Sequence, residues 1–536
     1  MTSIDDRIAA AEPTAPRPLG ELVARLRAER RLVQGAVVAA VRGLSVRGLS
    51  FDSRDVRPGA LFVAVPGEHA DGHNFVPAAA AAGAVAAVVE RPVAADIPQI
   101  VVDRSRTALA SAACWWYGDP SAELGVIGIT GTDGKTTTSF LAVAALEAAG
   151  VASGMLGTAA LEIGELRAPN PEHATTPDAP RLQAILRAMV AAGDRAAVVE
   201  TTSHGLALDR VAGVRYDVAI LTNVTHEHLE LHGTWEAYRD AKRSLFDRLA
   251  VGPMNPVKAV RGWPRTGIVN ADDPSAAVFV EATRVAGARV LTYSAHGPAD
   301  VRATKVTESH GGRRVSFRYL APSGGAELRL QIAGRFNVYN ALAVIALGEA
   351  IGLDPPAVRV GLASVSVVPG RMERVDAGQP FEVVVDYAHS PASLELVLDE
   401  LGRLARSRSG ELIAVFGSAG ERDRAKRPQM GRIAAERCRL VVVTDEDPRG
   451  EDPEAILAEI AAGAEAAGKR RGVDLLLIAD RRAAIRSALA RSRPGDVVLL
   501  AGKGHERTIL YADRAEPWNE RAEALAALAE MGFADQ

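Results

Sequence analysis

The sequence predicts an α/β protein of three domains, in which a central parallel sheet with a phosphate-binding loop carries an added antiparallel hairpin. Two observations support this. Short apolar runs of strand length alternate with Ala-rich stretches of helical pattern, and a Gly-rich turn follows a buried strand at residues 128–137. Strands that alternate with helices form parallel sheets with crossover helices. A chain of 536 residues is long enough for three or four domains, each with its own core.

The composition favours a cytoplasmic protein. The formal net charge is −4, so no global positive field attracts the chain to nucleic acid or to an anionic membrane. Its two cysteines, Cys114 and Cys438, lie far apart without metal-binding spacing, which is typical of a reducing compartment. The sequence contains no apolar run of the roughly 18 residues that span a bilayer, and its acidic opening is unlike a signal peptide. We expect a cytoplasmic monomer with no nucleic-acid or membrane partner.

The N-terminal part is predicted to be a flexible leader followed by a small α/β domain. Residues 1–18 are assigned to the leader because they contain Pro13, Pro16 and Pro18. The domain is expected over residues 19–122. Its predicted strands lie at residues 61–65, 84–90 and 100–103, with helical stretches between them.

The central domain is predicted over residues 123–366. It opens with a buried strand at residues 124–130, and further strands are expected at residues 196–200 and 218–222. Near its end, apolar and polar residues alternate in two runs, which contain Phe317 and Leu330 and are separated by a Gly-containing turn. This pattern predicts an antiparallel hairpin added to the parallel sheet.

A third α/β pattern extends over residues 367–536. Five apolar runs, each followed by a polar loop and a helical stretch, are predicted to be strands, at residues 381–386, 412–416, 440–444, 475–478 and 496–500. Ligands in such sheets collect at the carboxyl ends of the strands, so functional residues are expected in the loops that follow them.

The turn at residues 128–137, with the sequence GITGTDGKTT, predicts an ATP or GTP site. Backbone N–H groups at the start of the following helix form a cradle for phosphate. Lys135 is placed to reach the β- and γ-phosphates, and the Thr136 hydroxyl to ligate Mg²⁺. Ile129 stands where the strict phosphate-loop motif has its first glycine. The predicted nucleotide contacts in this turn are Gly131, Thr132, Asp133, Gly134, Lys135, Thr136 and Thr137.

Glu200 ends the predicted strand at residues 196–200, where many phosphate-loop proteins place a carboxylate for metal or water. We therefore take Glu200 as a candidate Mg²⁺ ligand, and a surface carboxylate at a strand end as the alternative. His204 follows closely and is interpreted as a structural histidine.

The stretch from Asn223 to Lys242 (NVTHEHLELHGTWEAYRDAK) resembles the Mur ligases, the ATP-dependent amino-acid ligases of peptidoglycan precursor synthesis. The likeness extends from residues 49–54 (LSFDSR) to residues 502–506 (GKGHE) and is strongest to the members that form the tripeptide. It implies that the N-terminal domain holds a uridine nucleotide and the central domain holds ATP. It further implies that a Rossmann-like C-terminal domain brings the incoming amino acid, so that catalysis requires domain closure.

The resemblance assigns roles to residues that would otherwise look ordinary. Lys242 and His228 correspond to metal-binding positions; relatives carbamylate the lysine, which turns a cation into an oxygen ligand for a second Mg²⁺. With Lys135 and Glu200, they form the expected catalytic set. Implied ATP contacts outside the turn are Asn337, Arg371, Asp386 and His389. Implied contacts to the UDP-sugar and its dipeptide are Ser53, His69, Thr175, Thr176, Thr202 and Arg210.

The amino acid that is added stays open at this point. The tripeptide-forming members imply contacts from Arg422, Gly502 and Glu506, while the discriminating motif reads Glu446-Asp447-Pro-Arg449 instead of the Asp-Asn-Pro-Arg of enzymes that select meso-diaminopimelate. Arg449 favours a substrate with a second carboxylate, whereas the acidic residues Glu446 and Asp447 favour the side-chain ammonium of L-lysine or L-ornithine. Asp133 is a further departure, because relatives usually have asparagine there.

The resemblance implies an ATP- and Mg²⁺-dependent ligase that joins a free diamino acid to UDP-N-acetylmuramoyl-L-alanyl-D-glutamate through an acyl phosphate. Charge on the phosphates and the developing oxyanion would be neutralised by cations held in place, without a covalent enzyme intermediate. Two alternatives stay open. One is another ligase of the superfamily, either resembling folylpolyglutamate synthetase or performing the next muramoyl ligation. The other is a phosphate-loop regulatory NTPase, which would hydrolyse ATP without any amino acid.

Overall fold

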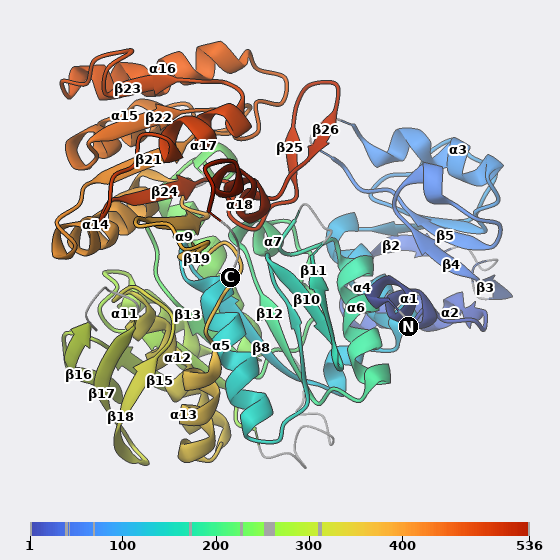
Figure 1. The fold of residues 1–536 in the computed structure, drawn as a ribbon. Coiled ribbons are helices and arrows are strands. Elements are labelled where there is room, and N and C mark those ends of the chain that lie inside the picture. Colours follow the sequence, from blue (N-terminus) through green and yellow to red (C-terminus); the bar gives the residue numbers. More distant parts are fainter. Residues whose placement is uncertain are drawn as a thin grey trace.

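The computed structural model describes residues 3–37, 41, 43–67, 70–170, 174–225, 229–250, 263–308 and 314–533. It confirms the α/β fold, with three main sheets that each carry helices (Figure 1). None of the helices in the described ranges has the length and apolar character needed to cross a membrane.

The N-terminal domain is built on a five-stranded sheet in the order β2-β7-β6-β5-β4. Its strands are β2 (Leu32–Val37), β4 (Gly48–Ser50), β5 (Ala60–Val63), β6 (Ala86–Val89) and β7 (Gln99–Val102), and a separate pair joins β1 (Arg17–Pro18) to β3 (Ser45–Val46). Its α-helices after the leader are α2 (Leu19–Ala28), α3 (Val76–Ala81) and α4 (Ser105–Tyr117). The three strands predicted from the sequence correspond to β5, β6 and β7.

The prediction of a flexible leader is wrong for residues 4–10, which form the helix α1 (Ile4–Ala10). Ser3 and Asp6 cap its first turn reciprocally. Ile4 and Ile8, one helical turn apart, are buried in the core shared with the central domain. Prolines later in the segment therefore mark only the connection between α1 and the rest of the domain.

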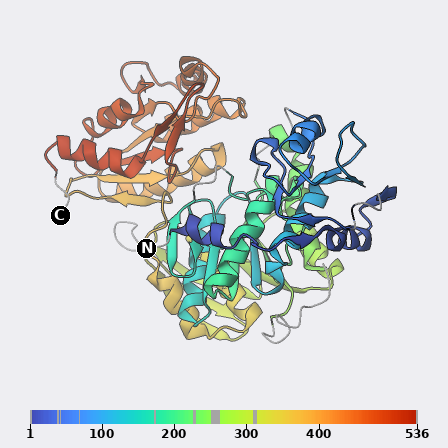
Figure 2. The ribbon, with the colours of Figure 1, turned by 90° about the vertical axis from the view of Figure 1, so that its right-hand side faces the viewer.

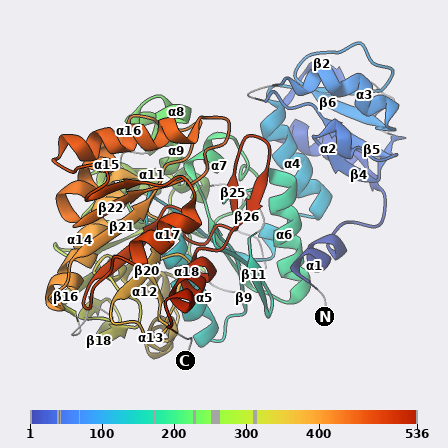
Figure 3. The same ribbon diagram turned by 45° about the horizontal axis from the view of Figure 1, so that its top comes forward.

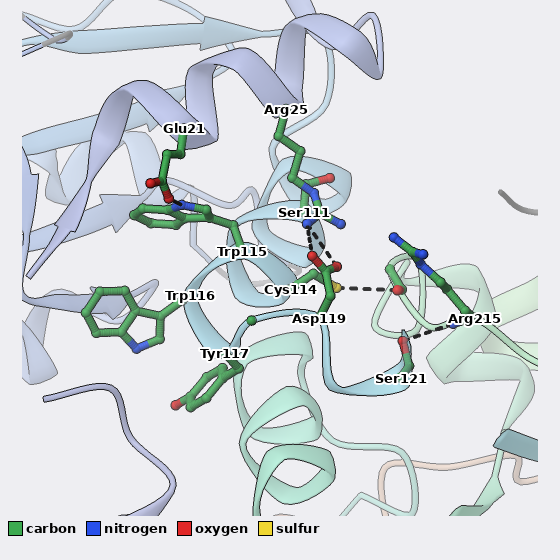
Figure 4. Close-up of polar contacts among 12 residues, drawn as sticks. Glu21, Arg25, Ser111, Cys114, Trp115, Trp116, Tyr117, Asp119, Ser121 and Arg215 are labelled. Carbon is green, nitrogen blue, oxygen red and sulfur yellow. Dashed lines mark hydrogen bonds and ion pairs between the residues drawn. The ribbon is translucent and has the colours of Figure 1, made fainter. Parts of the chain in front are cut away.

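The end of α4 joins the N-terminal domain to the central one. Inside the N-terminal domain, Trp115 donates from its indole nitrogen to Glu21 at 3.0 Å, and Arg25 pairs with Asp119 at 2.9 Å (Figure 4). In the same view Cys114 donates from its thiol to the Gly213 carbonyl at 3.4 Å, and burial raises the pKa of this thiol to about 12. One continuous apolar core runs through both domains at this junction, so we expect them to move together.

The central domain contains an eleven-stranded sheet in the order β11-β10-β9-β12-β8-β13-β14-β15-β16-β17-β18. Its strands are β8 (Gly125–Thr130), β9 (Ser153–Leu156), β10 (Ala160–Ile163), β11 (Leu166–Pro169), β12 (Ala196–Glu200), β13 (Val218–Leu221), β14 (Thr266–Asn270), β15 (Arg289–Ser294), β16 (Val301–Glu308), β17 (Val315–Ala321) and β18 (Gly324–Leu330). The strands from β9 to β16 in this order are parallel. The predicted hairpin is confirmed as β17 and β18, which turn between Ala321 and Gly324.

Helices cover both faces of this sheet. The α-helices are α5 (Lys135–Ala148), α6 (Ala179–Ala192), α7 (Ser203–Ala207), α8 (Leu229–His232), α9 (Trp235–Asp247), α11 (Ala276–Val285), α12 (Asn337–Ile351) and α13 (Pro355–Ser364). One core contains apolar residues of α5, α12 and α13, and the other those of α6, α9 and α11. Strand β8 therefore lies between two apolar layers, and its carboxyl end opens towards the C-terminal domain (Figure 1).

The C-terminal domain has a six-stranded sheet in the order β19-β20-β24-β21-β22-β23, parallel except for β19. Its strands are β19 (Glu373–Val375), β20 (Glu382–Asp386), β21 (Leu412–Phe416), β22 (Leu440–Val443), β23 (Leu475–Leu477) and β24 (Val497–Ala501), followed by the hairpin of β25 (Thr508–Leu510) and β26 (Ala515–Pro517). Helices α14 (Pro391–Ser407), α15 (Lys426–Arg437) and α16 (Pro453–Ala466) share one core, and α17 (Arg481–Leu489) and α18 (Glu520–Glu530) the other. This doubly covered parallel sheet is the expected Rossmann-like arrangement.

The three domains lie around the carboxyl end of the central sheet. Figure 2 shows the C-terminal and N-terminal domains on different sides of the molecule, and Figure 3 shows the β25–β26 hairpin in the region between them. Loops of all three domains are therefore near one another.

Candidate active site

The phosphate loop connects β8 to α5. Gly131 and Gly134 have φ angles of +152° and +84°, in the region that favours glycine. A side chain at Gly134 would begin 2.5 Å from Asn340 Oδ1. Lys135 donates from Nζ to the carbonyl oxygens of Gly131 and Thr132, at 2.9 and 2.7 Å. The loop is thus curved around its own lysine at the N-terminus of α5, where backbone N–H groups favour an anion.

Residues that follow β13 brace this loop. Thr222 donates from its hydroxyl to the Asp133 carbonyl at 2.6 Å. Asn223 Oδ1 accepts from the Asp133 backbone N–H at 3.0 Å, and its amide nitrogen donates to the carbonyl of the same residue at 3.2 Å. These contacts use the backbone of Asp133, so this support of the loop does not depend on whether residue 133 is aspartate or asparagine.

Glu200 lies at the end of β12, next to the phosphate loop, and is fully buried. Its carboxylate accepts from the Thr136 hydroxyl at 3.1 Å, and from the hydroxyl and backbone N–H of Thr158 at 2.7 and 3.0 Å. Because Glu200 is buried, the alternative that it is a surface carboxylate at a strand end is wrong. Mg²⁺ prefers oxygen ligands, and the carboxylate of Glu200 and the hydroxyl of Thr136 offer such oxygens beside the phosphate loop.

The threonines predicted to hold the dipeptide surround Glu200. Thr175 lies 2.9 Å from Thr158, hydroxyl to hydroxyl. Thr176 and Thr202 lie 3.0 Å apart in the same way. Arg210 donates to the Thr176 carbonyl at 2.9 Å. The segments at residues 175–176 and 200–202, far apart in the sequence, therefore form one polar wall.

Lys242 lies on α9 and points into the protein, with only 2% of its surface exposed. Its Nζ donates to the Gly131 carbonyl at 2.7 Å and lies 4.3 Å from the centre of the Tyr238 ring. The Tyr238 hydroxyl is in turn 3.0 Å from that of Thr132. Lys242 is therefore no ordinary helix-surface lysine, because it touches the phosphate loop.

Arg371 connects the C-terminal domain to the phosphate loop. Its guanidinium donates to the Thr136 hydroxyl at 3.3 Å and lies 4.5 Å from the centre of the Tyr387 ring. The Nδ1 atom of His389 is 2.8 Å from the Tyr387 carbonyl. Arg371 and His389 thus approach the same tyrosine, and the arginine reaches the central domain directly.

Two further residues predicted to contact ATP, Asp386 and Asn337, form hydrogen bonds within the protein. Asp386 accepts from the backbone N–H groups of Met372 and Ala388, both at 2.8 Å, and burial raises its pKa. Asn337 donates to the Ala333 carbonyl at 2.6 Å and accepts from Asn340 at 2.8 Å. These contacts hold Asp386 within the C-terminal domain and Asn337 at the start of α12 in the central domain.

The loops after β22 and β24 bring together the residues predicted to meet the amino acid. Lys503, which is fully buried, donates to Asp447 at 2.8 Å and also to Glu506. Tyr387 donates to the other oxygen of Glu506 at 3.2 Å. Burial alone would lower the pKa of Lys503, but the two carboxylates raise it above its ordinary value. Lys503 therefore stays charged and joins the two loops.

A pocket lies between the N-terminal and central domains, beside Arg210. Its walls carry Phe51, Val65, Arg106, Leu109, Asp178, Ala179, Leu208, Asp209 and Arg210. Two arginines, at positions 106 and 210, give this pocket the donors that suit carboxylate or phosphate oxygens. Arg210 also pairs with Asp178 at 3.0 Å.

Four residues predicted to belong to the site are not placed there by hydrogen bonds or ion pairs in the described part of the chain. Ser53 begins a short 3₁₀ turn, and Arg422 is exposed on the loop after β21; neither makes a side-chain hydrogen bond with another described residue. His69 and His228 lie outside the described residues. Within the described ranges, no group of three or more His, Cys, Asp or Glu residues is placed to hold a metal ion.

Sequence reasoning missed several residues that complete the site. Thr158 and Lys503 are the clearest: one binds Glu200, and the other joins Asp447 to Glu506. Lys503 lies inside the GKGHE segment and could have been found there, because a lysine three residues before the predicted contact Glu506 suggests an ion pair. Thr158 carries no signal of its own in the sequence.

Three family models together match most of the chain. They describe the Mur ligase family catalytic domain (residues 34–117), the Mur ligase middle domain (residues 129–348) and the Mur ligase glutamate ligase domain (residues 370–504). A UDP-N-acetylmuramyl-tripeptide synthetase of Roseiflexus sp. (strain RS-1) is 50% identical over 494 residues, which cover 91% of this chain and 95% of that protein. The chain belongs to the Mur ligase family.

Other proteins that this chain resembles are also Mur ligases. A UDP-N-acetylmuramyl-tripeptide synthetase of Deinococcus radiodurans is 44% identical, covering 90% of this chain and 95% of its own length. A UDP-N-acetylmuramoyl-L-alanyl-D-glutamate–2,6-diaminopimelate ligase of Geobacter metallireducens is 39% identical over 96% of this chain and its own full length. A solved ligase of that same name has a TM-score of 0.64 and 29% identity, over 97% of this chain and 100% of that one.

Membership of this family makes the chain an ATP-dependent ligase that forms amide bonds. The hypothesis of a phosphate-loop regulatory NTPase is therefore set aside. The matched relatives include tripeptide synthetases and diaminopimelate ligases.

Proposed function

We propose that this Mur ligase uses ATP to join a free diamino acid to UDP-N-acetylmuramoyl-L-alanyl-D-glutamate. The observation that carries the proposal is the convergence of three groups: the phosphate loop with Glu200, the threonine wall with Arg210, and the loop pair joined by Lys503. They supply places for a nucleotide, an acidic substrate and an incoming amine. The names of the tripeptide synthetases of Roseiflexus and Deinococcus point to the same product class.

In the proposed reaction, a carboxylate oxygen of the dipeptide attacks the γ-phosphorus of ATP, and ADP leaves. The resulting acyl phosphate is then attacked by the amine of the diamino acid, and phosphate leaves as the amide forms. Lys135 and the N–H groups at the start of α5 hold the phosphates, while Arg210 holds a substrate carboxylate. Arg371 links the C-terminal domain to the phosphate loop at Thr136. Most of the rate enhancement comes from positioning and charge stabilisation.

The site also fits Mg²⁺. Thr136 and Glu200 would hold one ion, and Lys242, once carbamylated, would join His228 at a second. Bound Mg²⁺ would neutralise the charge that gathers on the phosphates. Uncarbamylated Lys242 is a cation and cannot bind a metal, so this assignment depends on the modification. We also propose that the enzyme acts as a cytoplasmic monomer, with domains over residues 19–122, 123–366 and 367–536.

Phosphate release tests the proposal directly. The purified enzyme, ATP, Mg²⁺ and the UDP-muramoyl-dipeptide are mixed with or without meso-diaminopimelate, L-lysine or L-ornithine. We expect rapid phosphate release only when an accepted diamino acid is present, together with one tripeptide per phosphate. Release at the full rate without any amino acid would contradict the proposal and favour a hydrolase.

A further inference from the structure

Asp209 is held in a strained backbone conformation at the boundary between the N-terminal and central domains. Its φ angle is +55°, in the left-handed region that a residue with a side chain adopts only at a cost. It follows α7 and comes directly before Arg210, and both residues line the pocket between the two domains. Such strain persists only where surrounding contacts hold the residue in place, and it is found most often at functional sites.

The carboxylate of Asp209 is bound through both of its oxygens. Its Oδ2 atom accepts from the Thr107 hydroxyl at 3.1 Å and pairs with Arg104 at 3.2 Å. Its Oδ1 atom lies 3.7 Å from a guanidinium nitrogen of Arg248. Thr107 is in α4 and Arg104 directly precedes that helix, whereas Arg248 directly follows α9 in the central domain. Asp209, with a side chain only 15% exposed, therefore ties the turn after α7 to one element of each domain.

The backbone of the same turn places Arg210. The Arg210 N–H donates to the Gly205 carbonyl at 2.9 Å, and the Ala212 N–H donates to the Asp209 carbonyl at 3.1 Å. The Arg210 side chain then reaches the Thr176 carbonyl in the threonine wall, at 2.9 Å. Because a guanidinium recognises a carboxylate only within a narrow range of directions, the course of this turn decides whether Arg210 can serve the substrate.

We infer that Asp209 is a positioning residue for Arg210, because it fixes the turn in the geometry that presents the guanidinium to a carboxylate of the UDP-muramoyl-dipeptide. The inference rests on the proposed function, in which Arg210 holds that carboxylate. Asp209 does not itself bind the substrate carboxylate, since two like charges repel. It follows that loss of the Asp209 carboxylate weakens binding of the dipeptide substrate and leaves binding of ATP, on the phosphate loop, unchanged.

Calorimetry on the purified full-length enzyme provides the test. We would measure Kd for the UDP-muramoyl-dipeptide and for ATP in the wild type, Asp209→Gly and Asp209→Asn. Glycine accepts the positive φ and removes the carboxylate, whereas asparagine tolerates the same φ and keeps an acceptor for Thr107. We expect Kd for the dipeptide substrate to rise about 10-fold in Asp209→Gly and by less in Asp209→Asn, with Kd for ATP within about twofold of the wild type. An unchanged Kd for the dipeptide substrate in every variant that folds would overturn the inference.

Asp119 is the matched control. It is also an aspartate with a positive φ, of +53°, and it also pairs with an arginine, Arg25, at 2.9 Å. It lies two residues after the end of α4, outside the described lining of the pocket. Asp119→Gly is expected to leave Kd for the dipeptide substrate within about twofold of the wild type, even where thermal unfolding shows a loss of stability equal to that of Asp209→Gly. An equal rise of Kd in both glycine variants would show a general loosening of the domain boundary and overturn the inference.

Combined substitutions show whether Asp209 acts through Arg210. Arg210→Ala alone should weaken binding of the dipeptide substrate, and adding Asp209→Gly should then change Kd by less than about twofold, because the effects of coupled residues are not additive. A further rise as large as that of Asp209→Gly alone would overturn the inference. A wild-type enzyme that binds the UDP-muramoyl-dipeptide but joins no diamino acid would overturn the proposed function alone, because these comparisons of Kd need no catalysis.

Discussion

Lys242 is buried beside the phosphate loop, where an unmodified ammonium has to be balanced by nearby oxygens. If it is carbamylated in the active enzyme, Lys242→Ala removes a metal ligand and should lower kcat about 100-fold or more. Added short carboxylates should restore part of this activity, because they can supply the missing oxygen. Lys242→Arg is the matched control, since it keeps the charge and cannot be rescued. A fully active alanine variant would contradict the assignment.

Asp445 provides a test that depends on pH. Burial raises its pKa to about 6, although Tyr511 donates to it at 3.3 Å. A carboxyl group with a folded-state pKa above its ordinary value stabilises the fold when protonated, and this stabilisation is lost as the pH rises through about 4 to 6. Asp445→Asn should therefore gain free energy of unfolding relative to the wild type between pH 4.5 and pH 7.5 in urea titrations. A difference that stays constant over this range would contradict the shift.

The residues of the phosphate loop were predictable because the chemistry fixes their order along the chain. The contacts of Lys503 with Asp447 and of Thr158 with Glu200 were not, because each joins segments more than forty residues apart. Sequence patterns report periodicity and local motifs, and they say little about which loops meet in space.

Helix α1 is the element for which sequence and structure differ most. The prolines after it suggested a leader, but Ile4 and Ile8 bury themselves against the central domain and Arg7 donates to the Ile163 carbonyl at 2.8 Å. Ile8→Ala should lower the free energy of unfolding by about 2–4 kcal/mol in urea titrations. The exposed neighbour Ala9 offers a control, since Ala9→Ser should change it by less than about 0.5 kcal/mol. Equal effects of the two substitutions would show that α1 does not dock.

Buried strands such as β8, β12 and β20 were predicted from apolar runs, and the β17–β18 hairpin from alternation. Strands β9, β10 and β11 were not predicted, because polar residues or glycine interrupt their short apolar pattern, namely Gly154, Glu162 and Arg167. β9 pairs with β12, β10 with β9 and β11 with β10, so pairing within the sheet decides their structure and local propensity contributes little.

The whole molecule divides into one large unit and one smaller one. The N-terminal and central domains share an apolar core, while the C-terminal domain meets the phosphate loop through Arg371. Gly370 precedes Arg371 in the chain and approaches the GKGHE loop closely. A side chain at Gly370 would begin 2.3 Å from the backbone nitrogen of His505. Three domains were predictable from the alternation of strands and helices; their mutual placement was not, because it depends on contacts such as these.

The central claim is that ATP activates a carboxylate of the muramoyl-dipeptide as an acyl phosphate before the amine attacks. It is tested most directly by labelling that carboxylate with ¹⁸O and analysing the products by mass spectrometry. We predict that the released phosphate carries one ¹⁸O atom for every tripeptide formed, because the oxygen that bridges carbon and phosphorus leaves with the phosphate. Phosphate without label, or label recovered in AMP, would contradict the claim.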